Sequence, residues 1–327
     1  MKKHSMMKIL TVLASLIIFI NASELNTNNL NTKKLAYLVS DINIPFWKIM
    51  AKGIQNKAIK EGYEVEIYSS DNLKKEELSN LSKILKSNVD GLIISPINSS
   101  TAVTILKLAK LSKLPVVISD IGANKGEYVS FVSSNNKDGA YEIGKILAKK
   151  MKQQNWDKIG TVGIIAISQK RANGKARTEG FMKAMKEANI KSAGLLQIEN
   201  FSDLETYKYS IKLIKDDPNL RAIWLQTSNS YKGALSAIKD MHKEKEVLLI
   251  SFDSEPEFLN IIPKGTLIAS AMQQPYLMGE KSVELLDKHI KGFSVEKNLK
   301  LNILAISAEN IQLYLPIIKK NVLGIEE

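Results

Sequence analysis

Short apolar strands alternate with amphipathic helices along this chain, and this alternation limits the fold more than any other feature of the sequence. Residues 35–39 form an apolar run typical of a buried strand, and residues 46–61 carry apolar side chains at helical spacing. The alternation continues with strands at 63–68, 91–94 and 115–118 and helices at 76–86 and 101–111. Strands that are apolar on all sides need helices on both faces, which predicts a parallel, doubly wound sheet.

A second unit of the same kind begins after residue 134. Its expected strands lie at 159–166, 195–198, 222–225 and 247–250, and its helices at 140–151, 178–188, 207–214 and 231–241. One more strand at 265–272 and a helix at 281–286 then follow. These last elements predict that the chain crosses back between two tandem α/β units instead of ending in the second.

The composition is that of a globular protein with two domains. The chain has 327 residues, of which 44% are hydrophobic and 24% charged. There is no cysteine, which excludes disulfides, thiolate metal sites and thiol catalysis. The net charge of +12 comes largely from lysines scattered along helix faces, without an arginine-rich arm. This pattern favours a solvated surface over a nucleic-acid partner.

The N-terminus has the order of a secretory signal. Lys2, Lys3 and Lys8 precede an apolar run at 9–20, and small residues follow from Ala22. The apolar run is shorter than the roughly 20 residues that span a bilayer, although an uncleaved membrane anchor remains the alternative. We expect a signal peptide at 1–22, cleavage after Ala22, a flexible leader at 23–33 and a mature protein in a bacterial periplasm.

Motifs for enzymatic chemistry are missing. The chain has no G-x-S-x-G elbow and no phosphate loop, and Gly160 and Gly163 give only a fragment of a dinucleotide fingerprint. The three histidines, His4, His242 and His289, are too far apart in sequence for a ligand spacing. The sequence therefore predicts a binding protein with no catalytic residues, no metal and no cofactor.

Candidate binding residues follow the strands, because ligands of open parallel sheets lie beyond the carboxyl ends of the strands. Carboxylates and amides there can fix a polar ligand, and aromatic faces can stack on a sugar ring or a cation. The candidates are Asp41, Phe46, Trp47, Asp120, Lys175, Phe201, Thr227, Asp253 and Gln273. Two alternatives stay open, namely a helix N-terminal acceptor role for Asp41 and core packing for Phe46 and Trp47.

Six stretches in order along the chain carry a resemblance to a known family. They are 40–63, 89–103, 114–120, 176–185, 248–257 and 269–286. With them the chain resembles the type I periplasmic solute-binding proteins, especially the ribose/galactose-type sugar binders related to LacI-type effector domains. The resemblance implies two Rossmann-like lobes joined by three crossovers that close on a ligand. The expected lobes are 34–134 with 275–303, and 135–274 with 304–327.

The resemblance also implies roles for several candidates. Phe46 and Trp47 match the aromatic pair that sandwiches the sugar from the first lobe, and Phe201 matches the aromatic of the second lobe. Asp120, Asp253 and Gln273 match hydrogen-bonding positions of the family.

Four positions depart from the family pattern. Ile44 and Thr227 stand where asparagine is usual, and Ile121 and Lys175 stand where arginine is usual. Arginine binds vicinal hydroxyls with a planar fork, which isoleucine cannot do.

These departures suggest a hypothesis about the ligand. Asp41, Asp120 and Asp253 without a neighbouring arginine would suit a ligand with fewer hydroxyls or with cationic character, such as a modified sugar, an amine or a small signalling molecule.

The sequence thus predicts a monomeric periplasmic protein that binds a small polar, sugar-like ligand between its lobes and delivers it to the permease of an ABC importer. The alternative is a sensor that signals to a membrane sensor kinase or chemoreceptor, with a ligand that need not be a sugar. A transcription regulator would need an N-terminal helix-turn-helix, and residues 1–34 read instead as a signal and a polar leader. An enzyme is the remaining rival.

Overall fold

A computed structural model describes residues 33–325, and its first sheet consists of six parallel strands. The order is β11-β5-β4-β3-β1-β2. The strands are β1 (Lys33–Val39), β2 (Tyr63–Ser69), β3 (Gly91–Ser95), β4 (Val116–Ser119), β5 (Ser130–Ser134) and β11 (Asn298–Leu301). We call this sheet with its helices lobe 1.

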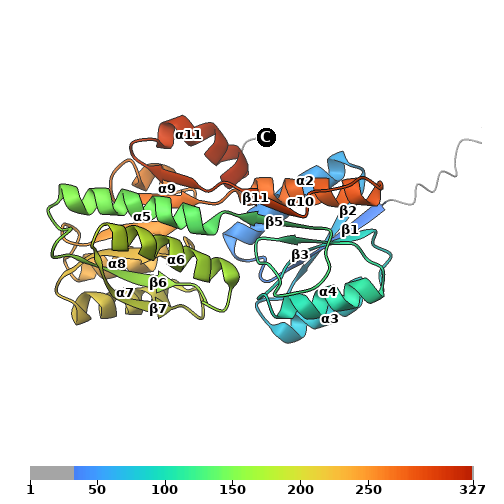
Figure 1. Ribbon diagram of the computed structural model, residues 1–327, viewed down its shortest axis with the longest axis horizontal. Helices are drawn as coiled ribbons and strands as arrows, with labels where there is room; N and C mark the ends of the chain where they lie inside the picture. The colour runs from blue at the N-terminus through green and yellow to red at the C-terminus, as the bar shows by residue number, and fades with distance from the viewer. Residues whose placement is uncertain (1–32, 326–327) are drawn as a thin grey trace, which may run out of the picture. The chain divides into compact units, whose positions relative to one another are not determined.

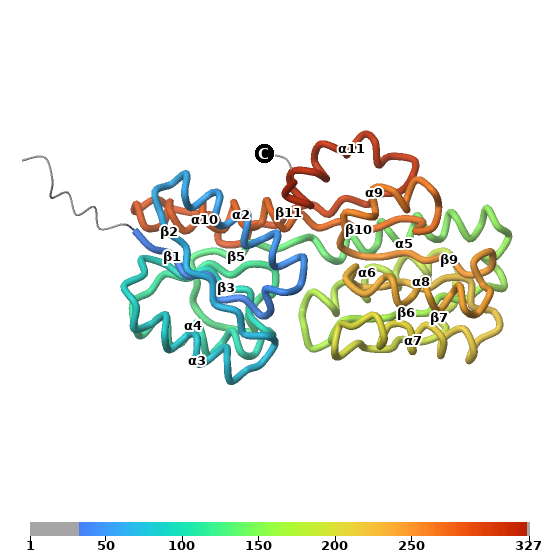
Figure 2. Tube along the Cα trace, turned by 180° about the vertical axis from the view of Figure 1, so that it is seen from behind, coloured from blue at the N-terminus to red at the C-terminus, as the bar shows by residue number. Residues whose placement is uncertain are grey.

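Helices cover both faces of the first sheet, as the apolar strands require. Leu35, Tyr37 and Val39 of β1 pack with α2 (Pro45–Lys60) and α10 (Pro275–Ile290). Ala36 and Leu38 belong to the opposite core, with α3 (Lys74–Ile84) and α4 (Thr101–Leu111). Alternate residues of one strand therefore enter two different cores. Helices α2 and α10 lie side by side although they are far apart in the chain (Figures 1 and 2).

The second sheet also has six strands, in the order β12-β10-β9-β8-β6-β7, and with its helices forms lobe 2. The strands are β6 (Thr161–Ala166), β7 (Lys191–Gln197), β8 (Leu220–Leu225), β9 (Leu248–Phe252), β10 (Ala269–Met272) and β12 (Leu304–Ser307). Five of them pair in parallel, and the edge strand β12 is antiparallel to β10. The predicted α/β class with two doubly wound lobes is confirmed, apart from that edge.

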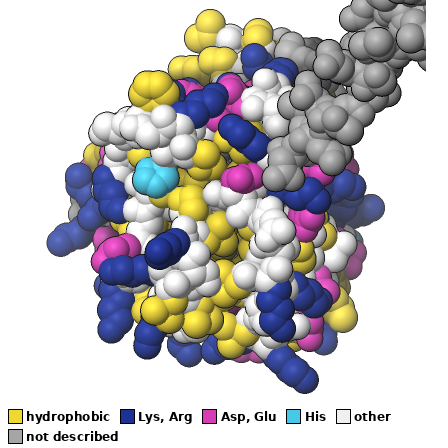
Figure 3. All heavy atoms as spheres, turned by 90° about the vertical axis from the view of Figure 1, so that its right-hand side faces the viewer, with side chains coloured by type: hydrophobic (Ala, Val, Ile, Leu, Met, Phe, Trp, Pro, Cys, Tyr) yellow, Lys and Arg dark blue, Asp and Glu magenta, His cyan; other side chains and the backbone are white. Residues whose placement is uncertain are grey.

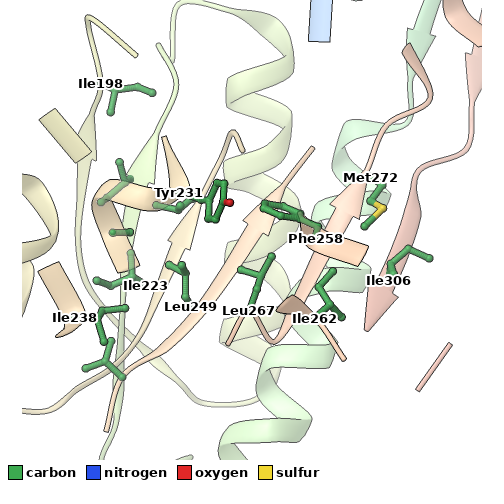
Figure 4. Close-up of a cluster of buried hydrophobic side chains, with 14 of the residues drawn as sticks. Ile198, Ile223, Tyr231, Ile238, Leu249, Phe258, Ile262, Leu267, Met272 and Ile306 are labelled. Carbon is green, nitrogen blue, oxygen red and sulfur yellow. The ribbon is translucent and has the colours of Figure 1, made fainter. Parts of the chain in front are cut away.

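Lobe 2 also has a core on each face of its sheet. One core contains residues of α5 (Asn136–Gln153) and α6 (Ala172–Glu187). The other contains residues of α8 (Tyr231–Asp240), α9 (Phe258–Ile261) and the C-terminal α11 (Ile311–Ile317) and η1 (Ile318–Val322), together with α7 (Asp203–Asp216). In this core the rings of Tyr231 and Phe258 meet edge to face at 5.0 Å (Figure 4).

The chain passes between the two sheets at three places: from β5 to α5, from β10 to α10, and from β11 to β12. A hydrogen bond joins the second and third crossovers, since Gln274 Nε2 donates to the carbonyl oxygen of Asn302 at 2.8 Å. We propose the lobe boundaries 34–134 with 275–303 and 135–274 with 304–327, which the sheet membership of the strands supports.

Several elements differ from the sequence-based expectations. Strands β5, β11 and β12 lie outside the predicted elements. β5 is serine-rich and β11 alternates in exposure, so neither forms a continuous apolar run, whereas β12 is apolar but only four residues long. Helix α6 begins at Ala172, six residues before the predicted start at 178. That earlier start matters for the binding site described below.

The predicted signal peptide at 1–22 and the leader at 23–32 lie outside the described residues, and Lys33, assigned to the leader, is the first residue of β1. Within residues 33–325, no helix is long and apolar enough to cross a membrane.

Candidate ligand-binding site between the lobes

Loops from both lobes meet in a small cavity, which we call the inner cavity. Seven predicted residues line it: Phe46, Trp47, Asp120, Phe201, Thr227, Asp253 and Gln273. Five further lining residues were not predicted as site residues: Ile44, Ile167, Arg171, Asn173 and Arg177. Most of the expected candidates are therefore brought together by the fold from separate loops.

Two predicted residues lie outside the inner cavity. Asp41 accepts hydrogen bonds from the backbone N–H of Asn43 at 3.0 Å and from the side chain of Asn72 at 3.2 Å. Lys175 is exposed on α6. Helix α2 begins after Ile44 with Pro45 in its first turn, so Asp41 is not its N-cap residue.

The two aspartates of the cavity are held in unusual backbone conformations. Asp120 directly follows β4 with φ of 64°, and Asp253 directly follows β9 with φ of 68°. Non-glycine residues rarely adopt positive φ, and such conformations concentrate at functional sites. Both side chains are almost completely buried.

Hydrogen bonds fix these carboxylates but leave acceptors free. Asn173 of lobe 2 donates to Asp120 Oδ2 at 3.2 Å, and Gln273 Nε2 donates to Asp253 Oδ1 at 2.6 Å. Asp120 Oδ1 and Gln273 Oε1 are buried without a hydrogen-bond partner among the described residues. Buried polar atoms are normally paired, so these two oxygens are suited to accept hydrogen bonds from a ligand.

Burial changes the electrostatics of these groups. It raises the pKa of Asp120 to about 6, and the neighbouring charge of Asp253 acts in the same direction while Arg177 opposes it. Burial also raises the pKa of Asp253. Ligand hydroxyl groups that donate to these carboxylates would favour their ionised forms.

Arg177 stands beside Asp253 and corrects one expectation. Its Nη1 lies 3.5 Å from Asp253 Oδ2, its Nε donates to Asn136 Oδ1 at 2.8 Å, and Nη1 also donates to the carbonyl oxygen of Gln226 at 2.6 Å. The hypothesis of cavity carboxylates without a neighbouring arginine is therefore wrong.

The physical reason is the register of α6. Residues 175 and 177 are two positions apart and so point to different sides of a helix with 3.6 residues per turn. Lys175 faces solvent, whereas Arg177, only 3% exposed, shares the buried face with Asn173. Arg177 is not among the predicted site residues, because the candidates come from the segments that follow the strands and Arg177 lies within the helix.

Aromatic side chains form the remaining walls. Phe46 and Trp47 meet edge to face at 4.9 Å in the first turn of α2. Trp47 also belongs to the core of lobe 1, so this side chain both packs in the core and lines the cavity. Phe201 comes from lobe 2 and has φ of 52°.

Phe201 is positioned by the start of α7. Ser202 accepts the N–H of Glu205, and the Glu205 carboxylate accepts the N–H groups of Glu199 and Asn200 at 2.9 Å. These hydrogen bonds cap the start of α7 and fix the loop that presents the ring. The guanidinium carbon of Arg171 lies 5.6 Å from the centre of the Phe201 ring, within cation–π range.

A second, larger cavity adjoins the first, and we call it the outer cavity. Arg171 and Phe201 line both. The outer cavity has a volume of about 520 Å³ and the inner one about 40 Å³. Ligand pockets usually measure about 300–1,000 Å³, so a ring-sized ligand needs the inner cavity to widen as it enters.

The inner cavity combines buried carboxyl and amide groups with cationic and aromatic side chains. The described residues contain no cluster of three or more His, Cys, Asp or Glu side chains that could hold a metal ion. On the end of lobe 1 seen in Figure 3, basic side chains are spread among acidic and polar ones and form no continuous patch.

Comparisons with known proteins agree with this fold. A ribose import binding protein of Haemophilus influenzae is 30% identical over 92% of this chain and 100% of its own length. One similar solved structure, a carbohydrate transporter solute-binding protein from Agrobacterium radiobacter in complex with D-arabinose, has a TM-score of 0.81 at 20% identity, covering 89% of this chain and 98% of that one. Another, from Actinobacillus succinogenes with bound D-allose, has a TM-score of 0.79 at 18% identity, covering 86% of this chain and 100% of that one.

The sequence pattern described as "Periplasmic binding protein domain" matches residues 35–293. This match confirms the resemblance stated from the sequence, and the chain is a binding protein and not an enzyme. The chain belongs to the periplasmic binding protein family.

Proposed function

We propose that this protein binds a small polar ligand, a sugar or a sugar-like molecule, between its lobes and delivers it to an ABC importer. The observation that carries the proposal is the inner cavity, in which Asp120 Oδ1 and Gln273 Oε1 are buried acceptors beside aromatic rings from both lobes. Hydroxyl groups of a sugar can donate to these oxygens while its C–H face packs on the rings. The names of the relatives, which refer to ribose import, support this class of ligand.

The ligand-contacting set in this proposal is the predicted group that lines the cavity, with Arg171 and Asn173 added. Phe46 and Trp47 act from lobe 1, and Phe201 acts from lobe 2. The three crossovers serve as the hinge through which the cavity widens and closes. Closure changes the surface that a membrane permease contacts.

The setting of this function is the periplasm. The predicted signal at 1–22 directs export, and the mature protein works as a monomer without a cofactor. The sensor alternative stays open, because members of the family serve both roles, but Arg177 beside Asp253 weakens the argument that missing arginines favour it.

Isothermal titration calorimetry of the mature chain against a panel of aldoses and their derivatives tests the proposal. We expect at least one panel member to bind, and Asp120→Ala and Phe201→Ala to weaken that binding while Lys175→Ala does not. If nothing in the panel binds, or if the cavity variants bind as well as the parent protein, the proposal is wrong. Uptake of the same ligand by cells with and without the gene then tests delivery to an importer.

A further inference from the structure

The outer cavity carries charge that the inner cavity does not explain. Its lining includes three cationic side chains, Lys74, Lys170 and Arg171, and one carboxylate, Glu199. Amide side chains such as Asn98 complete its polar lining. Basic groups therefore outnumber acidic ones in the lining of the outer cavity.

The cations come from both lobes. Lys74 is the first residue of α3 in lobe 1, whereas Lys170 and Arg171 precede α6 in lobe 2. Because like charges repel, closing the lobes around an empty outer cavity brings unfavourable electrostatic energy. A negative group between them would convert that repulsion into attraction.

The cations of the outer cavity are also free to act on a ligand. Within residues 33–325, the side chains of Lys74, Lys170 and Arg171 take part in no hydrogen bond or ion pair with the protein. Over a longer distance, however, Arg171 is attracted to Asp120 and Lys74 to Glu77. Many other lysines of the chain pair with carboxylates, for example Lys57 with Glu61 at 2.6 Å. Arg171 contacts the Phe201 ring instead, and both residues line the two cavities.

We propose that the ligand is a sugar-like molecule with an anionic substituent, a phosphate or a carboxylate. The neutral ring occupies the inner cavity, and the anionic group occupies the outer cavity between Lys74 and Lys170, with Arg171 at the junction. This inference rests on the proposed function and names the ligand class of the same site. Hydrogen bonds between charged partners are stronger than neutral ones, so the substituent adds affinity.

Matched pairs of neutral and anionic ligands test the inference by calorimetry. The probes are a panel of aldoses, their terminal phosphates and the corresponding aldonic acids, with inorganic phosphate alone as a further probe. The proteins are the parent chain, the double variant Lys74→Ala/Lys170→Ala, and the control Lys48→Ala/Lys175→Ala. The control changes the net charge equally at exposed positions outside both cavities.

We expect an anionic member to bind about tenfold or more tightly than its neutral partner. The Lys74→Ala/Lys170→Ala variant should lose that advantage and keep its affinity for the neutral sugar, and the control should keep both. Equal binding of neutral and anionic partners, or the same loss in the control, overturns the inference and leaves the proposed function intact. Inorganic phosphate that binds as tightly as the sugar phosphate also overturns it, and a panel without any binding overturns both proposals.

Discussion

Asp120 and Asp253 occupy equivalent places in the two sheets. Each directly follows a strand, has φ between 64° and 68°, and donates its backbone N–H to a carbonyl oxygen of the adjacent strand at 2.9 Å. The acceptors are Val132 in β5 and Ala271 in β10. The two lobes thus use the same backbone conformation and the same hydrogen bond to hold a carboxylate at the inner cavity. The charge of Asp253 also disfavours the ionised form of Asp120.

The first prediction concerns the pH dependence of stability without ligand. The pKa of Asp120 is about 6 in the folded protein because of burial, and about 4 in an unfolded chain. As the pH rises from about 4 to 6, the unfolded chain releases this proton first, so the free energy of unfolding falls. The total effect is about 3 kcal/mol, from roughly two pKa units at 1.36 kcal/mol each.

Asp120→Asn removes this titration, so the variant should gain stability relative to the parent as the pH rises through that window. Urea unfolding at both ends of the window measures the difference. A difference that stays constant with pH would mean that Asp120 does not carry a raised pKa.

The second prediction concerns Arg177, which joins the start of α5 to the cavity through Asn136 and Asp253. Arg177→Met removes these bonds and leaves Asp253 buried without its cation. Breaking one side of a buried ion pair typically costs about 3–5 kcal/mol, so we expect a loss of that size in the free energy of unfolding.

Lys175→Met, two residues earlier on the exposed face of α6, is the matched control. It should change stability by less than about 0.5 kcal/mol. Denaturation midpoints of the two variants that coincide would contradict the role assigned to Arg177.

The sequence predicted the two-lobed architecture and most of the cavity because both follow from local patterns. Apolar strands predicted the sheets, and the residues after each strand end included Asp120 and Asp253. Arg177 was missed because its position depends on the register of α6, which starts at Ala172 and not at 178. Arg171 lies in the segment 168–175 that follows β6, but Lys175 is the predicted candidate from that segment, because the family pattern has arginine there.

The sequence also does not predict the backbone conformation of Phe201. The positive φ of Phe201 results from the capped start of α7 and from Asn229, whose side chain donates to the Phe201 carbonyl oxygen at 2.8 Å. A phenylalanine gives no local signal for that conformation, unlike glycine. Lys175 was wrongly included among the cavity residues. Its residue type suits ligand binding, but it lies on the exposed face of α6.

The third prediction separates the ring of Phe201 from its backbone. Phe201→Ala and Phe201→Gly both remove the ring and its contact with Arg171, so both should weaken ligand binding, by about tenfold. Glycine adopts positive φ without strain, so the Gly variant should be more stable than the Ala variant, by about 1 kcal/mol. Calorimetry measures ligand binding by the two variants, and thermal unfolding measures their stability. An Ala variant more stable than the Gly variant would contradict the inference that the backbone at position 201 is strained for any residue other than glycine.

The last prediction concerns the contact between α2 and α10, which joins the helix carrying Phe46 and Trp47 to the helix that follows Gln273. A Cβ atom on Gly53 would overlap the carbonyl oxygen of Tyr276, and one on Gly279 would overlap that of Met50. Alanine favours an isolated helix over glycine by about 1 kcal/mol, but overpacking against a backbone that cannot yield costs about 1–3 kcal/mol or more.

We therefore expect Gly53→Ala to lower the free energy of unfolding by about 2 kcal/mol, because the helices must move apart to admit the methyl group. Gln55→Ala, exposed on the same helix, is the control and should leave stability nearly unchanged. Since α10 continues directly from the crossover that contains Gln273, displacement of this helix should also weaken ligand binding. A Gly53→Ala protein at least as stable as the Gln55→Ala control would show that the two helices do not approach so closely in solution.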